Sequence, residues 1–95
     1  MKALTAIVMA ALVLPSAALA ADPPPGAASC SGCHAASAAV QTPVPRINGR
    51  NADEIVAAMT AFRTGATPST LMGRITKGFT EEETRSIAAW LASQK

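Results

Sequence analysis

The sequence predicts a small all-α domain of three to four helices. Apolar residues recur at helical spacing in its second half, each such stretch opens on a capping residue, and no stretch alternates as a strand would. The chain has only 95 residues, and 3% of them are aromatic. A domain of this size rarely buries enough apolar surface by itself, so we expect a staple, a metal or a cofactor to supply the missing bulk.

The first twenty residues form a segment apart from this domain. Lys2 precedes an apolar run over residues 3–14, and Ala18, Leu19 and Ala20 provide a small-residue cleavage site. This pattern is typical of a secretory signal, so we expect residues 1–20 to be removed and residues 21–95 to form one domain in the periplasm of a bacterium. An uncleaved anchor is the alternative, but the apolar run is well short of the roughly 20 residues that cross a bilayer.

The charge of the remaining chain is nearly balanced. Lys2 is one of eight basic residues, so residues 21–95 carry seven basic and six acidic side chains and a net charge of +1. Such a balance offers no basic field for nucleic acid, and we expect no nucleic-acid partner.

Loops dominate the first part of the predicted domain. Residues 22–26, DPPPG, form a stiff extended leader because three consecutive prolines exclude a helix. Residues 26–39 contain a short helical candidate, rich in Ala and Ser. Residues 42–48, TPVPRIN, are a loop, since two prolines around Val44 force extended backbone.

Two amphipathic helices follow. The first begins after the N-cap Asn51, has Ile55, Met59 and Phe62 on one face, and stops at Gly65. Residues 65–78 are broken by Gly, Pro and hydroxyl residues, with one helical turn expected over residues 71–75.

The last helix begins with a capping box. Thr80 is its N-cap and Glu83 the third helical residue. The face expected to be buried consists of Ile87, Trp90, Leu91 and Gln94.

Both cysteines and the only histidine lie within five positions, in Cys30-Ser-Gly-Cys33-His34. A Cys-x-x-Cys pair alone occurs in thioredoxin-type dithiols, zinc half-sites and local disulfides. The chain lacks the strands and length of a thioredoxin fold, and it has no further Cys or His for a fourth zinc ligand. A carboxylate could complete the set, but no Asp or Glu lies within eighteen residues downstream of His34. A disulfide remains open for an exported protein, but it gives His34 no role.

Cys-x-x-Cys-His is also the attachment sequence of c-type haem, and this interpretation gives all three residues a role. The Cys30 and Cys33 thiols would form thioethers with the two vinyl groups of one haem, and His34 would be the proximal iron ligand. Covalent attachment prevents loss of the cofactor from a domain too small to grip it. We therefore expect one covalently bound haem c.

Elimination narrows the candidates for the distal iron ligand. A second histidine is not available, and Met59 and Met72 are the two methionines outside the signal segment. Met59 lies on a helical apolar stripe, where methionine is more often core filler, whereas Met72 lies before the last helix. Met72 is the expected ligand, and a Met/His pair raises the reduction potential relative to two histidines. Coordination by Lys77, or an open distal site, stays an alternative.

Four arginines are candidates for pairing with haem propionates or with charges of a partner. Arg46 and Arg50 are the better propionate candidates because they neighbour the proximal loop. Simple solvation at the surface is the alternative for each of the four, Arg46, Arg50, Arg63 and Arg74.

The chain resembles a small class I cytochrome c. The resemblance is carried by the haem motif together with Pro45-Arg46-Ile47-Asn48-Gly49, the Met72 loop and Trp90 in the last helix. The resemblance implies that the Pro45 carbonyl accepts a hydrogen bond from His34 Nδ1 and fixes the orientation of the imidazole. It also implies that Ile47 packs on the haem edge.

The same resemblance implies contacts for the last helix. Ile87, Trp90 and Leu91 would contact the helix that carries the cysteines. For Trp90, ordinary core packing predicts the same position.

Residues 51–92 are similar to the cytochrome subunit of flavocytochrome c sulfide dehydrogenase. The similarity is clearest in Pro68-Ser69-Thr70-Leu71-Met72-Gly73-Arg74-Ile75 and Lys77-Gly78-Phe79-Thr80. It implies a partner, a periplasmic FAD flavoprotein that oxidises sulfide and passes electrons singly to the haem. Members of that family can carry two haem domains, whereas this chain has one motif, and the usually Gly-rich turn after the histidine here reads AASAAVQT.

The expected function is therefore periplasmic electron transfer, with no acid/base or nucleophile constellation for independent catalysis. The chain would act as the cytochrome subunit of an FAD sulfide dehydrogenase and pass electrons to a downstream acceptor. A free soluble periplasmic shuttle is one alternative, and its contacts would be weak and small. A haem sensor that binds gases through an open distal site is the other.

Overall fold

Two helices of thirteen residues each form the frame of the domain in the computed structural model, which describes residues 22–94. The predicted signal segment lies outside these residues. In chain order the elements are α1 (Ala27–Cys30), α2 (Ala52–Thr64), α3 (Met72–Ile75), the 3₁₀ turn η1 (Thr76–Gly78) and α4 (Glu81–Ser93). Residues 22–94 contain no strand, so the all-α prediction is confirmed.

The termini of α2 and α4 are set by the residues that the sequence indicates. The Asn51 side chain accepts hydrogen bonds from the backbone N–H groups of Asp53 (2.9 Å) and Glu54 (3.2 Å), and Gly65 ends α2 at a φ of 80°. Thr80 and Glu83 form the predicted capping box at the start of α4. Local hydrogen bonds of this kind satisfy the free N–H groups of a helix start, which is why these two boundaries are readable from sequence.

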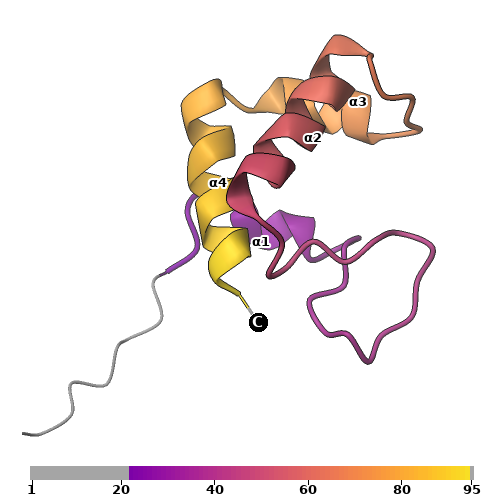
Figure 1. The fold of residues 1–95 in the computed structure, drawn as a ribbon, viewed down its shortest axis with the longest axis vertical. Coiled ribbons are helices and arrows are strands. Elements are labelled where there is room, and N and C mark those ends of the chain that lie inside the picture. Colours follow the sequence, from indigo (N-terminus) through magenta and orange to yellow (C-terminus); the bar gives the residue numbers. More distant parts are fainter. Residues whose placement is uncertain (1–21, 95) are drawn as a thin grey trace, which may run out of the picture.

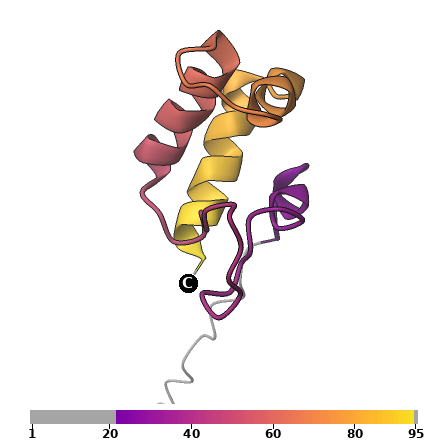
Figure 2. The ribbon, with the colours of Figure 1, turned by 90° about the vertical axis from the view of Figure 1, so that its right-hand side faces the viewer.

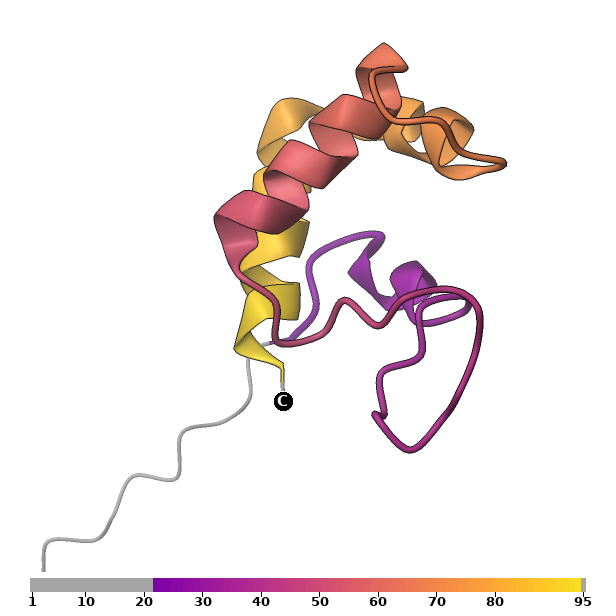
Figure 3. The same ribbon diagram turned by 45° about the vertical axis from the view of Figure 1, so that its right-hand side comes forward.

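The helices α2 and α4 pack against each other, and the short elements attach to this pair. The α3 and η1 segments contact α2, whereas α1 contacts α4. Figure 1 shows α2 and α4 crossing side by side, and Figure 2 shows α1 and the loop that follows it on one side of the pair. In Figure 3, α3 lies opposite α1 on that same side.

The segment that holds the cysteines is less helical than its composition suggests. Within residues 26–39 only Ala27–Cys30 is helical, and turns and bends follow. Residues 31–50 then form the long loop of Figure 3 that leads back to α2.

The buried apolar core is very small. Five apolar residues of the described chain are buried, namely Ala27, Ile55, Ile87, Ala88 and Leu91. Trp90 is half-buried and packs against this cluster. Such a core is as small as the composition predicts, so additional apolar bulk is needed to stabilise the domain. None of the helices in the described part of the chain has the length and hydropathy that a membrane crossing requires.

Candidate haem site

The Cys30–His34 segment continues from α1 as a helical turn. The backbone N–H of His34 donates to the Cys30 carbonyl at 2.9 Å, and that of Cys33 donates to the same carbonyl at 3.3 Å. Both thiols are free; Cys33 is exposed and Cys30 is half-buried. Burial raises the pKa of the Cys30 thiol above its ordinary value, against a smaller lowering by a backbone hydrogen bond.

The His34 ring is held in one tautomer by the backbone of the next loop. Its Nδ1 lies 2.5 Å from the Pro45 carbonyl oxygen. A carbonyl can only accept, so Nδ1 carries the proton and Nε2 keeps its lone pair in the neutral imidazole. This is the arrangement of a histidine ready to bind a metal through Nε2.

The loop that supplies the Pro45 carbonyl is itself anchored. Arg46 Nε donates to the Ala36 carbonyl at 2.8 Å, which ties the loop to the segment behind His34. The Gly49 N–H donates to the Leu91 carbonyl at 2.9 Å, which ties its other end to α4. Gly49 has a φ of 79°, and a Cβ there would lie 2.9 Å from the Gln94 carbonyl oxygen, so the approach requires glycine.

An apolar cavity of about 240 Å³ lies between the Cys/His segment and the helices. His34 and both cysteines line it from one side, and Met72 and Ile75 of α3 line it from another. The rest of its wall is mostly apolar and consists of Ser29, Ile47, Ile55, Met59, Phe79, Thr84, Ile87 and Leu91. The side chains of a histidine, two cysteines and a methionine thus line one apolar space.

A second cavity of about 200 Å³ extends this space along α2. His34, Ile47 and Met72 line both cavities, and Arg50 and Glu54 line the second one alone. A flat apolar cofactor with a charged edge suits this combination, because its body would contact the aliphatic wall and its edge would reach Arg50.

The two methionines differ in their surroundings. Met59 lines the cavities but also packs against the buried core cluster, and it contributes to a further cavity bounded by α2 and α4. Met72 lines both cavities beside His34 and is not part of the core cluster. This difference favours Met72 over Met59 as the side chain that is free to bind a metal.

The residues fit a c-type haem better than the other interpretations of the motif. Both thiols are free, so the described chain has no disulfide. No group of three or more His, Cys, Asp or Glu side chains among residues 22–94 is arranged to hold a metal ion. An apolar space beside two thiols and a tautomer-fixed histidine suits a covalently attached porphyrin.

The arginines proposed for the propionates have different positions. Arg50 lines the second cavity, whereas the Nε of Arg46 is engaged with the loop backbone. Arg63 and Arg74 lie elsewhere, and both line an open polar hollow at the end of α2. Arg50 is therefore the arginine best placed to meet a charged cofactor edge.

Phe79 and Ile75 belong to the cavity wall, a position that the sequence did not predict for either. Phe79 also packs against Gly26, the N-cap of α1, whose φ is 86°. The one sequence signal for this contact is the glycine directly before the predicted helix, because a residue without a side chain allows another group to approach the backbone closely.

Two curated proteins are similar to this chain. The cytochrome subunit of sulfide dehydrogenase from Chlorobaculum tepidum is 37% identical over 65 residues, which are 68% of this chain and 59% of the relative. Cytochrome c-552 from Acidithiobacillus ferridurans is 32% identical over 65 residues, 68% of this chain and 28% of the relative. The chain thus spans less than two thirds of the length of either. No protein-family model and no solved structure matches. These similarities confirm that the chain resembles a small c-type cytochrome, and in particular the cytochrome subunit of sulfide dehydrogenase.

Proposed function

We propose that residues 21–95 form a class I cytochrome c domain that carries one covalent haem c and transfers electrons in the periplasm after removal of residues 1–20. The observation that carries this proposal is the placement of His34 and Met72 on one apolar cavity beside two free thiols. The haem c would supply one-electron redox chemistry.

The proximal side of the site is built by residues that keep one orientation. Cys30 and Cys33 would each add a thiol across a vinyl group, so that a carbon–sulfur bond forms and the thiol proton moves to carbon. His34 would bind the iron through Nε2, and its hydrogen bond to the Pro45 carbonyl keeps the ring proton on Nδ1. This bond increases the electron density of the imidazole and fixes its plane.

The distal side is built by Met72. Its thioether would be the second iron ligand, and a Met/His pair would raise the reduction potential relative to two histidines. The aliphatic wall of Ile47, Ile55, Ile87 and Leu91 keeps water away, which also favours the less charged reduced state. If His34 and Met72 both held the iron in either oxidation state, little in the site would have to reorganise on electron transfer.

We propose further that the electrons come from an FAD flavoprotein that oxidises sulfide. The support is the similarity to a protein named as a cytochrome subunit of sulfide dehydrogenase. The chain itself would perform the electron-transfer step and leave sulfide chemistry to its partner.

Copurification tests this partnership. The tagged full chain is expressed in its native host, and the periplasmic eluate is analysed for FAD and for reduction of the haem by sulfide. We expect a flavoprotein to coelute and to accelerate the reduction relative to the separated chain. A clean monomer without flavin would overturn the subunit role and favour the free shuttle.

A further inference from the structure

The helix that carries Met72 is too short to hold its own shape. The α3 segment has four residues, and its N-cap, Leu71, provides no side-chain cap. Helices of one turn are unstable without outside contacts because nucleation costs more than a single hydrogen bond returns. Methionine also has three rotatable bonds, so the backbone must place it accurately if its sulfur is to meet one fixed point.

Two hydroxyl groups hold the backbone of this turn from either end. Thr76 Oγ1 donates to the Met72 carbonyl at 2.8 Å and lies 3.3 Å from the Gly73 carbonyl. On the other side, Ser69 Oγ accepts from the Gly73 N–H at 2.8 Å. The peptide group between Met72 and Gly73 is thus held at its carbonyl and at its N–H by side chains from after and before the turn.

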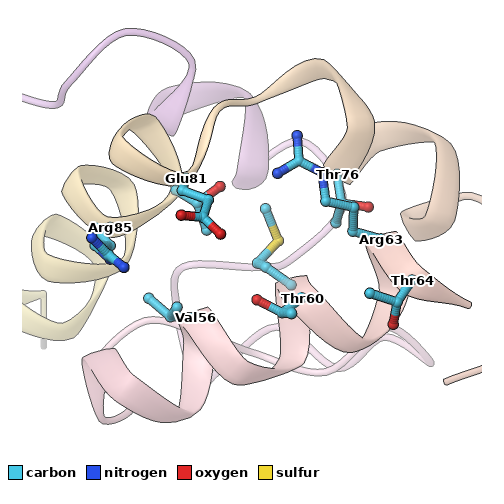
Figure 4. A pocket seen from close by; sticks show the side chains of 9 residues that line it. Val56, Thr60, Arg63, Thr64, Thr76, Glu81 and Arg85 are labelled. Atoms are coloured by element: carbon cyan, nitrogen blue, oxygen red, sulfur yellow. The ribbon is translucent and has the colours of Figure 1, made fainter. Parts of the chain in front are cut away.

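Thr76 holds the Met72 turn more firmly than Ser69 does, because Thr76 is almost fully buried, with 2% of its surface exposed. A buried hydroxyl cannot exchange its protein partner for water, so its bond to the Met72 carbonyl is retained in the folded state. Thr76 also lines the cavity of about 210 Å³ shown in Figure 4, where it lies beside Arg63. It therefore connects the Met72 turn to the α2–α4 frame.

We propose that Thr76 and Ser69 are positioning residues for the distal ligand, which set how firmly the Met72 thioether is presented toward His34. This inference rests on the proposed haem c with Met72 as its distal ligand. A hydroxyl that bonds four residues back is common in helices and by itself predicts only a change in stability. The proposal predicts in addition a change in the rate at which Met72 leaves the metal.

Ligand displacement separates these two effects. Imidazole at saturating concentration is mixed with the ferric holoprotein, and the loss of the sulfur-to-iron charge-transfer band reports the dissociation of Met72. We expect Thr76→Val to accelerate this loss about two- to tenfold, the range that one net hydrogen bond provides. Thr76→Ser keeps the hydroxyl and should stay close to the wild-type rate.

Two control variants show whether general destabilisation could have the same effect. Ala88→Gly loosens α4 inside the buried core without touching the Met72 turn, and Thr60→Val removes a threonine hydroxyl from α2 on the same cavity that Thr76 lines. We expect both to leave the displacement rate unchanged, even where the melting temperature of Ala88→Gly falls as far as that of Thr76→Val.

Each outcome decides the proposal. An unchanged rate in Thr76→Val, or the same acceleration in Ala88→Gly at equal melting temperature, would overturn it. If Thr76→Val yields no holoprotein, Ser69→Ala decides, because Ser69 is exposed, and an unchanged rate there is equally negative. A wild-type protein without the charge-transfer band would overturn Met72 ligation and this inference together, whereas a normal band that is insensitive to these variants would overturn the positioning role alone.

Discussion

The Phe79 ring lies so close to Gly26 that a Cβ atom on residue 26 would be 2.7 Å from Phe79 Cε1. Gly26 also has a φ of 86°, which side chains of L-residues rarely allow. This contact joins the N-terminus of α1 to the segment that leads from η1 into α4. Since Phe79 also lines the candidate haem cavity, the contact sets the distance between the thiol-bearing segment and the opposite wall.

Gly26→Ala should therefore destabilise the holoprotein by about 2 to 3 kcal/mol, the sum of a left-handed backbone cost and overpacking. Gly65→Ala is the matched control, because Gly65 has a φ of 80° but nothing within 4 Å of the added Cβ. It should cost only the backbone part, about 1 kcal/mol. Thermal unfolding followed by circular dichroism measures both. Equal costs for the two variants would show that the Phe79 contact has no energetic weight.

Arg63 bonds the backbone of the same aromatic residue. Its Nη2 donates to the Phe79 carbonyl, which joins α2 to the start of α4. We expect Arg63→Met to cost about 1 kcal/mol, less than a fully buried charged hydrogen bond because Arg63 is half-buried. Arg85→Met is the control. Arg63 and Arg85 both line the cavity of about 210 Å³ in Figure 4, but Arg85 is exposed. If both variants unfold at the same temperature, the Arg63 bond does not tie the helices together.

The helices that sequence reasoning places correctly are those whose ends are set by local hydrogen bonds. Asn51 and Gly65 bound α2, and Thr80 with Glu83 starts α4, so neighbouring residues alone contain the information. The bond between His34 and Pro45 spans eleven residues, and it was expected only through the resemblance to a known family.

The remaining features depend on contacts that a single sequence does not show. Nothing local in Phe79 indicates that it packs on Gly26, and nothing in Thr76 indicates that it is buried under α2 and α4. The α1 helix is similarly short: beyond Cys30 one hydrogen-bonded turn reaches His34, whose ring bonds the Pro45 carbonyl, and the helix extends no further. Tertiary contacts override the helix propensity of the alanines in residues 26–39.

Substitution of the two methionines tests which of them is the distal ligand. Met72→Ala should abolish the sulfur-to-iron charge-transfer band of the ferric protein and open the site to added cyanide or imidazole. Met59→Leu should keep the band, because Met59 packs with the core and leucine preserves most of its volume. Near-infrared absorption of both variants checks this. A band that survives in Met72→Ala and disappears in Met59→Leu would reverse the assignment.

Intact-mass measurement tests the boundary of the domain and the number of cofactors at once. The purified holoprotein should have the mass of residues 21–95 plus one haem, because Cys30 and Cys33 are the only thiols available for thioethers. After denaturation neither cysteine should react with iodoacetamide, since both sulfurs would be bonded to carbon. Replacement of both cysteines by alanine is the control and should give a chain from which denaturation releases any bound haem. A retained N-terminal segment would contradict signal cleavage, and an alkylated cysteine in the wild-type protein would contradict attachment through two thioethers.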